Sequence, residues 1–303
     1  MRFDCQARPL NVRARGETAR LAGRAAALVL AGALVSLSGC VTVNQDAPMP
    51  QEIGAQGIVI ERSLPKSLPE DSKAIPGSQL VLVPTESAAG LFVPLPFVSE
   101  VVTDVYHRYE ASTLATHYAA IDLYGTVQRA LDGSVLLKGG AGSNPLYPIG
   151  YVVACADGRY RVALAGRIEQ GKWTGRYVVH LPTTYSEDEV AKATPATLSA
   201  MRREFGDAAL IMRQLLERDA AGALPESRTR ADVGSLHLAC AKAAGLLKPE
   251  LVLARGAEVL EDGADHVIVR VAGDLRQSGP SGGLLYGVHY LRKDQLHTFK
   301  RKP

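Results

Sequence analysis

The feature that most constrains this chain is a short uncharged apolar run behind a basic N-terminal segment. Residues 25–37, AAALVLAGALVSL, carry no charge, and they follow six arginines that are opposed only by Asp4 and Glu17. Thirteen apolar residues are too few to span a bilayer, which takes about 20. They match the apolar region of a secretory signal peptide, with the basic flank on the correct side. We therefore expect this segment to be removed and to contribute nothing to the fold.

The sequence directly after this run reads Leu37-Ser38-Gly39-Cys40, which is a branched apolar residue, two small residues and a cysteine. This order resembles the lipobox of bacterial lipoprotein precursors. The resemblance implies cleavage before Cys40, a diacylglycerol on its thiol and a membrane partner bound through that lipid. In that family, an Asp directly after the cysteine favours retention in the inner membrane. This chain has Val41 at that position, so the resemblance points to a periplasm-facing outer-membrane location. The alternative locations are the outer leaflet of the inner membrane and the cell surface. The alternative interpretation of the segment is a buried helix that ends in an ordinary cysteine.

Removal of residues 1–39 changes the charge balance of the chain. The whole chain has 34 Lys+Arg against 31 Asp+Glu, and the segment takes six of the former and two of the latter. The remaining 28 basic and 29 acidic residues give a formal net charge of −1. Because a nucleic-acid-binding protein needs a basic surface, we expect no nucleic-acid partner.

The cysteine inventory also becomes simpler. Cys5 leaves with the signal peptide and Cys40 carries lipid, so Cys155 and Cys240 remain as an even pair in an oxidising compartment. We predict a disulfide between them. Two separately buried free thiols are the alternative.

The pattern of apolar residues predicts an α+β fold of antiparallel sheet meanders with packed helices. Tyr151–Ala156, Arg159–Ala165 and Trp173–Leu181 read as three consecutive strands. Ser186-Glu187-Asp188-Glu189 has the spacing of a capping box, and Thr194-Pro195 indicates the start of the strongest helix. The apolar stripe of that helix consists of Leu198, Met201, Phe205, Ala208, Met212 and Leu215. Further strand candidates follow from residue 233 to the end.

The predicted organisation has three parts. A lipoprotein signal peptide covers 1–39, a flexible tether covers 40–56, and an α+β domain covers 57–303. The resemblance to lipoproteins ends at Cys40, and the domain resembles no family.

The domain contains a weak internal match that suggests two similar halves, 88–185 and 186–303. Leu164-Ala165 with Glu169 matches Leu253-Ala254 with Glu258 at an offset of 89 residues. Chance similarity between short alanine-rich strands is the alternative.

Ser281 is the candidate nucleophile of the chain. It lies in Gly279-Pro280-Ser281-Gly282-Gly283, which fits G-x-S-x-G and resembles the serine segment of chymotrypsin-like proteases. A hydrolase elbow needs a helix after the serine, whereas LLYGVHYL reads as a strand, and Pro280 stands where those proteases usually have Asp. A glycine-rich hairpin loop is the alternative interpretation.

Other chemical motifs are weak. Ser63-Leu64-Pro65-Lys66 has the S-x-x-K spacing of penicillin-binding enzymes, but it lies in a proline-rich loop where that motif needs a helix start. The seven histidines show no metal-ligand spacing. Trp173, the one tryptophan, is expected to pack in the core or at its edge rather than stack on a ligand. We therefore assign no catalytic, cofactor-binding or metal residue.

The segment Ala88–Val98, AAGLFVPLPFV, has no polar side chain, and Pro94 and Pro96 exclude a regular helix there. It is either a buried loop or an exposed surface for an envelope protein partner. Taken together, the sequence predicts a non-enzymatic envelope lipoprotein that binds or scaffolds another component. An envelope-acting hydrolase centred on Ser281 and a periplasmic ligand-binding module are the alternatives.

Overall fold

The computed structural model describes residues 47–68, 72–83, 111–138, 140, 142–154, 159–234, 252–271, 286–296 and 298–302. All of these residues belong to one compact unit, Val43–Pro303. The predictions on Cys40, Cys155, Cys240, Ser281 and Ala88–Val98 fall outside the described residues.

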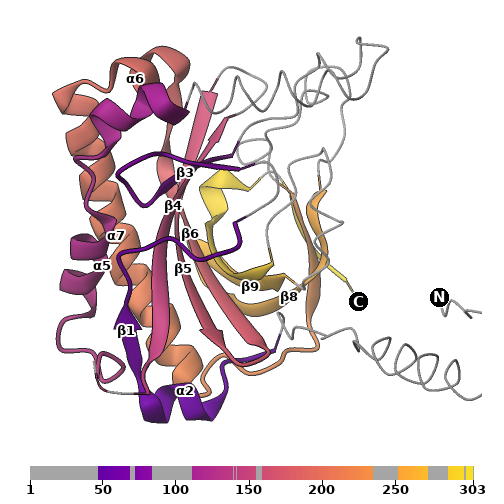
Figure 1. Ribbon diagram of the computed structural model, residues 1–303. Helices are drawn as coiled ribbons and strands as arrows, with labels where there is room; N and C mark the ends of the chain where they lie inside the picture. The colour runs from indigo at the N-terminus through magenta and orange to yellow at the C-terminus, as the bar shows by residue number, and fades with distance from the viewer. Residues whose placement is uncertain are drawn as a thin grey trace, which may run out of the picture. The chain divides into compact units, whose positions relative to one another are not determined.

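One mixed sheet of 11 strands forms the framework of this unit (Figure 1). Its order is β11-β7-β8-β9-β10-β6-β5-β4-β3-β2, with β1 beside β4. Among the described strands, only β1 with β4, β3 with β4 and β10 with β6 pair in parallel. The strands are β1 Ile58–Ile60, β2 Lys73–Ala74, β3 Leu80–Val83, β4 Asn144–Ala154, β5 Arg159–Gln170, β6 Trp173–Ser186, β7 Arg230–Gly234, β8 Val252–Asp262, β9 His266–Val271, β10 Gly287–Arg292 and β11 Thr298–Arg301.

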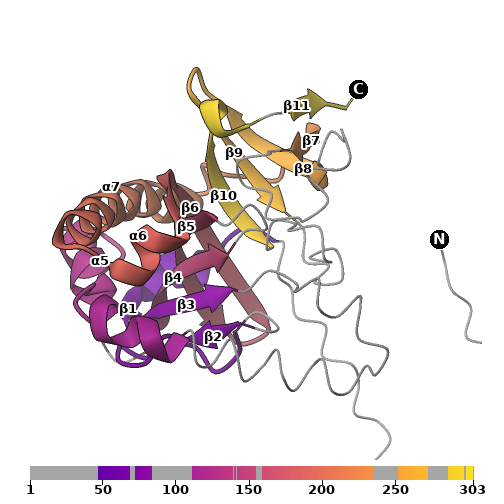
Figure 2. The same ribbon diagram turned by 90° about the horizontal axis from the view of Figure 1, so that it is seen from above.

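The helices cover one side of β4, β5 and β6 (Figure 2). They are α2 Gln51–Gln56, α5 Leu123–Leu131, α6 Glu187–Lys192 and α7 Pro195–Ala220, and residues 111–118 are also helical. The short 3-10 helix η3 Lys293–Gln295 lies apart from these, between β10 and β11. A mostly antiparallel sheet with helices on one side is an α+β fold, so the predicted fold class is confirmed.

Both predicted helix starts are confirmed by their capping geometry. The Ser186 side chain accepts from the Glu189 backbone N–H at 3.2 Å, and the Glu189 carboxylate accepts from the Ser186 N–H at 2.8 Å. Thr194 caps α7 by accepting from the Thr197 N–H at 3.2 Å, and Pro195 occupies the first turn. These caps satisfy N–H groups that a helix start otherwise leaves without partners.

The main core lies between α7 and the sheet. Five members of the predicted α7 stripe are at most 2% exposed: Met201, Phe205, Ala208, Met212 and Leu215. They pack against alternate residues of β5 and β6, including Leu164, Tyr177 and Val179. The opposite face of the sheet carries two smaller clusters, one on β3–β6 and one on β7–β11. Each strand of the meander is therefore buried on both sides over much of its length.

The predicted flexible tether over 40–56 is wrong for residues 47–56. Residues 51–56 form α2, whose Ile53 is fully buried in the main core together with Met49. The Trp173 indole N–H donates to the Ala47 carbonyl at 3.2 Å, so this tryptophan packs at the core edge as predicted. The apolar Met49 and Ile53 explain the difference, because burying them favours an ordered segment over a mobile one.

The 89-residue internal match is not reproduced by strand pairing. Leu164 pairs with Val179, so the offset requires Leu253 to pair with Ile268. Ile268 instead pairs with Glu261, eight residues further along β8. The residues that look alike in sequence therefore do not occupy equivalent positions in the two hairpins.

Two glycine substitutions should change stability in opposite directions. A Cβ on Gly150 would lie 2.9 Å from Leu123 Cδ1 and 3.3 Å from Phe205 Cζ, and closer still to Leu80. Because this overpacks the core, we expect Gly150→Ala to lower the free energy of unfolding by about 1–3 kcal/mol. Gly206 lies inside α7 with nothing within 4 Å of its Cβ position, so Gly206→Ala should raise it by about 0.5–1 kcal/mol. Urea unfolding of both purified variants measures this, and a shift of the same sign in both contradicts it.

Candidate functional site: a cleft between α7 and the sheet

A cleft of about 310 Å³ lies beside the first half of α7. It brings together residues that are far apart in the sequence. Its walls come from β6 (Val179, His180, Leu181 and Pro182), α7 (Glu204, Asp207, Ala208 and Ile211), β10 and η3 (Tyr290, Arg292, Lys293 and Asp294), and the turn before β9 (Asp265). A concave site with apolar walls and a few polar groups is the usual form of a ligand pocket.

Glu204 is the most unusual polar group of the cleft, because it is buried at 8% exposure without a cation from the described residues. The Thr183 hydroxyl donates to Glu204 Oε1, and the Tyr185 hydroxyl donates to Oε2 at 3.4 Å. No Lys, Arg or His nitrogen of the described residues lies within 4 Å of its carboxylate. Burial, together with the charge of Glu204, raises the pKa of Tyr185 well above its usual range. A buried carboxylate held only by hydroxyls is one that a cation would stabilise.

The two basic residues of the cleft are held by other carboxylates. Arg292 Nε donates to Asp294 Oδ1 at 3.0 Å, which raises the pKa of Arg292. Lys293 Nζ lies 2.6 Å from Asp262 Oδ1. Their charges are therefore compensated, and Glu204 and Asp207 give the cleft a net negative charge.

Aromatic and histidine rings form a further wall. His266 stacks on Tyr290 with 4.7 Å between ring centroids, and its ring nitrogens contact Glu261 at 2.9 Å and Asp265 at 2.8 Å. Because both ring nitrogens are engaged, His266 is fixed in orientation and holds the Tyr290 ring beside the cleft.

His180 forms a buried pair with His289 across β6 and β10. Its Nε2 lies 3.2 Å from His289 Nδ1, and the two rings stack at 5.5 Å between centroids. Burial, with a smaller contribution from His289, lowers the pKa of His180 to about 3. Both rings can share one hydrogen bond only when one of them donates and the other accepts, so His180 is neutral at physiological pH.

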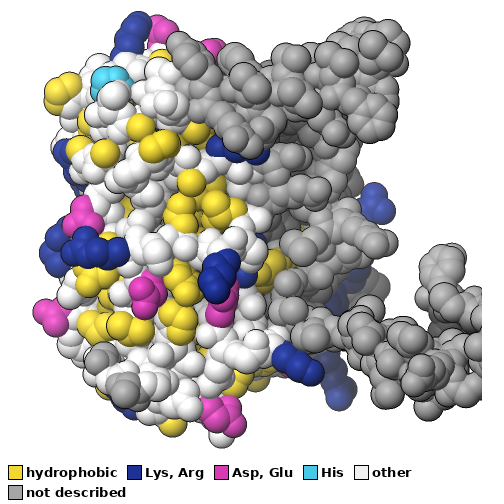
Figure 3. All heavy atoms as spheres, in the orientation of Figure 1, with side chains coloured by type: hydrophobic (Ala, Val, Ile, Leu, Met, Phe, Trp, Pro, Cys, Tyr) yellow, Lys and Arg dark blue, Asp and Glu magenta, His cyan; other side chains and the backbone are white. Residues whose placement is uncertain are grey.

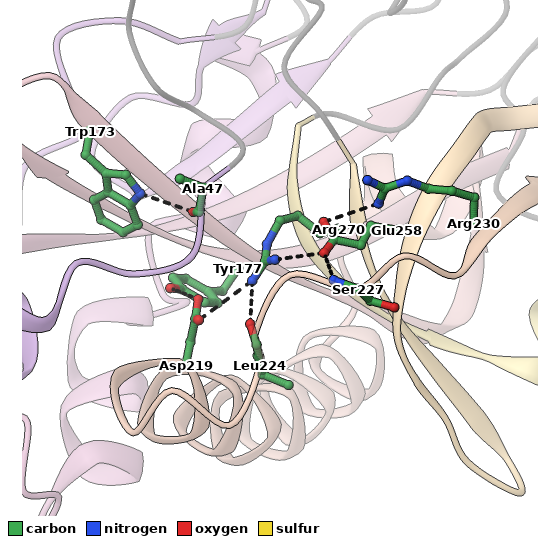
Figure 4. Close-up of polar contacts among 9 residues, drawn as sticks. All are labelled: Ala47, Trp173, Tyr177, Asp219, Leu224, Ser227, Arg230, Glu258 and Arg270. Carbon is green, nitrogen blue, oxygen red and sulfur yellow. Dashed lines mark hydrogen bonds and ion pairs between the residues drawn. The ribbon is translucent and has the colours of Figure 1, made fainter.

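A separate buried network has a structural role (Figure 4). Tyr177 donates to Asp219 Oδ2 at 2.7 Å, and Arg270 donates to the Leu224 carbonyl at 2.8 Å and lies 3.4 Å from Glu258 Oε1. Arg270 and Asp219 are each 3% exposed, and burial raises the pKa of Asp219. These contacts join β6, the end of α7, β8 and β9, and their burial leaves no approach for a substrate.

A second groove, of about 440 Å³, runs between α5 and α7. Its polar groups stabilise the helices themselves: Asp122 caps α5 by accepting from the Gly125 N–H at 2.9 Å, and Arg202 donates to the Ala120 carbonyl. Leu210 is 52% exposed there. On the face shown in Figure 3, charges of both signs are interspersed with apolar side chains, so this face carries no field of one sign.

Most residues that the sequence singled out are not brought into the cleft. Ser63 and Lys66 lie in a non-helical segment over residues 61–68, as predicted, so no helical turn places the lysine beside the serine. The Cys155–Cys240 disulfide and the role of Ser281 stay predictions. Within the described residues, no three His, Cys, Asp or Glu side chains are arranged to hold a metal ion.

Sequence reasoning missed Glu204 and Asp207. The signal was present, because Glu204 lies three residues after Met201 and four before Ala208, within the apolar stripe of α7. An acid on a buried helix face indicates either a hydrogen-bonded core group or a site.

In comparisons with known proteins, no family model, curated protein or solved structure matches the chain. Among the described helices, none has both the length and the apolar character needed to cross a bilayer.

The pKa of His180 predicts acid sensitivity. Because the folded value of about 3 lies below the unfolded value of about 6.5, the unfolded chain takes up a proton that the folded chain excludes. This contribution to stability is complete above about pH 6.5 and is lost as the pH falls toward 3, by less than about 1.4 kcal/mol per pH unit. We expect His180→Asn to show a shallower pH dependence of the unfolding free energy than the parent in urea unfolding between about pH 7 and 4. The exposed His117 provides the control, since His117→Gln should keep the parent slope. Equal slopes for His180→Asn and the parent would contradict the assignment.

Proposed function

We propose that this chain is a lipid-anchored protein of the bacterial cell envelope, and that its domain binds a ligand without transforming it. The basic segment, the 13-residue apolar run and Leu37-Ser38-Gly39-Cys40 occur in the order of a lipoprotein precursor, which supports lipid attachment at Cys40. Val41 supports an outer-membrane location that faces the periplasm. A protein partner bound through Ala88–Val98 belongs to the same proposal.

The buried, cation-free carboxylate of Glu204 beside the cleft is the observation that carries the binding role. The lining side chains Val179, Leu181 and Ile211 offer apolar contact, and Tyr290 offers an aromatic ring. A ligand with an ammonium or guanidinium group on an apolar body would pair with Glu204 and Asp207 and could use the Tyr290 ring for a cation–π contact. This supports a ligand-binding module more than a purely scaffolding role.

The anchor is tested by Cys40→Ala. Without the thiol no diacylglycerol can be attached, so we expect the protein to move from the detergent phase to the aqueous phase in Triton X-114 partitioning, and to lose labelling by an alkyne fatty acid. Cys5→Ala is the matched control, because that cysteine lies in the predicted signal peptide and its loss should leave both readouts unchanged. Continued fatty-acid labelling of Cys40→Ala would rule out this attachment site.

The cleft is tested by titrating the purified protein with butylamine, putrescine and spermidine in a calorimeter. A charge-assisted hydrogen bond contributes about 1.5–3 kcal/mol, so Glu204→Gln should weaken amine binding by roughly 10–100-fold. Glu226→Gln alters an exposed acid outside the cleft and should bind as the parent does. Uncharged butanol should not bind. Equal affinity of the parent and Glu204→Gln, or no saturable binding of any amine, counts against the proposal.

A further inference from the structure

The cleft beside the first half of α7 and the groove between α5 and α7 meet at one residue. Asp207 lines both of them, and it is exposed. On α7, Glu204 and Ile211 face the cleft, whereas Gly206 and Leu210 face the groove. Because about 3.6 residues complete a turn, these two pairs lie at the same level of the helix, about a third of a turn apart. A ligand held in the cleft therefore reaches the groove by passing over Asp207.

The floor of the groove is apolar and open. Leu210 is 52% exposed, and it is one of two large hydrophobic side chains that the described residues leave exposed. Gly206 carries no side chain, and nothing lies within 4 Å of the position that a Cβ would take there. Ala120 and Ala130 add small side chains to the lining. The groove of about 440 Å³ therefore has room for part of a ligand, and covering Leu210 would favour binding.

Two arginines of the groove keep most of their hydrogen-bonding capacity. Arg202 donates to the Ala120 carbonyl and Arg129 donates to the Thr126 hydroxyl, each at 3.4 Å. Within the described part of the chain, no carboxylate lies within 4 Å of either guanidinium. Asp122, the acid that lines the groove beside them, accepts instead from the first turn of α5 at 2.9 Å. Because each guanidinium has five N–H donors, both arginines can bind a carboxylate of a ligand.

The cleft and the groove therefore favour groups of opposite charge. Glu204 favours an ammonium group in the cleft, and Arg129 and Arg202 favour a carboxylate in the groove. One molecule that carries both groups satisfies both parts, and it loses its translational freedom only once. The path around α7 between the two parts is on the order of 10 Å long. An extended chain covers about 3.3–3.6 Å per residue, so roughly three to five residues join the two charged ends.

Asp207 also determines which kind of chain fits between the charged ends. Its exposed carboxylate lies between the apolar wall of the cleft at Ile211 and the apolar floor of the groove at Leu210. An alkyl chain over this carboxylate would remove its hydration and offer no hydrogen bond. A peptide backbone would donate an N–H to it, while the peptide side chains cover the apolar residues on either side. The alternation of apolar and acidic surface therefore favours a peptide.

We propose that the cleft and the groove together bind a short peptide with free ends. Its ammonium group binds Glu204, its backbone passes over Asp207, and its terminal carboxylate binds Arg202 and Arg129. This proposal rests on the amine-binding role of the cleft. It adds the groove to the site and specifies the length and the direction of the ligand.

The ligand side of the test compares tetraalanine with analogues that each lack one feature. We expect tetraalanine to bind the purified protein saturably in calorimetry. Its C-terminal amide should bind about fivefold more weakly, the size expected for an exposed ion pair. Its N-acetyl form should bind at least tenfold more weakly, because it leaves the buried Glu204 without a cation. Replacing each amide in turn by an ester removes one N–H donor, and one of these esters should bind about fivefold more weakly.

Variants of the protein assign each end of the peptide to its part of the site. Glu204→Gln should abolish the preference for tetraalanine over its N-acetyl form. Arg129→Gln combined with Arg202→Gln should abolish the preference for tetraalanine over its amide, and both arginines are exposed, so the double variant should fold. Arg203→Gln is the matched control, because it removes an exposed arginine of α7 that lines neither the cleft nor the groove. It should keep both preferences.

The outcomes separate this proposal from the function on which it rests. If butylamine binds through Glu204 but tetraalanine binds no more tightly than its amide, the peptide proposal is overturned and the amine-binding role stands. A preference for tetraalanine over its amide that survives in the double arginine variant also overturns it. Equal binding of every ester would exclude the backbone contact at Asp207 and with it a peptide ligand. If neither butylamine nor tetraalanine binds, both proposals fail.

Discussion

The pairing of β6 with β10 is the interaction on which the rest of the molecule depends. In the described residues it is the one link between the strands before α7 and those after it, and it involves Tyr177, Val178 and Val179 of β6. The pairing is parallel, so it needs the long excursion through α7 and β7–β9 before the chain returns. The Tyr177–Asp219–Arg270 contacts and the His180–His289 pair both reinforce this junction.

Buried charged side chains lie on opposite faces of the sheet at this same junction. Val179 and its neighbours form one wall of the cleft, whereas Arg176, three residues earlier on β6, points to the other face. Among the described residues, the cleft has a buried acid with no cation within 4 Å, and the other face has a buried arginine with no carboxylate within 4 Å. The sheet keeps these groups apart, because the backbone and its packed side chains lie between them.

Local patterns in the sequence predicted a large part of this fold. The capping box at Ser186, the Thr194-Pro195 helix start and the α7 stripe depend on residues a few positions apart, so the sequence shows them directly. The parallel β6–β10 pairing brings together residues about 110 positions apart, and no local pattern contains that information. The sequence did not predict that residues 47–56 are ordered, for the same reason, since Ile53 is buried by residues far along the chain. Glu204 was missed because an acid in an apolar stripe can serve the core as well as a site.

The packing of the N-terminal segment has a consequence for where the domain can work. Ala47 is already fixed against Trp173, so only seven peptide steps separate the proposed lipid on Cys40 from the body of the domain. Fully extended, those steps span at most about 25 Å. If Cys40 carries the proposed lipid, a domain held this close stays at the surface of its own membrane. Under that proposal, any ligand would have to come to the bilayer, because the short link would not let the domain move away from it.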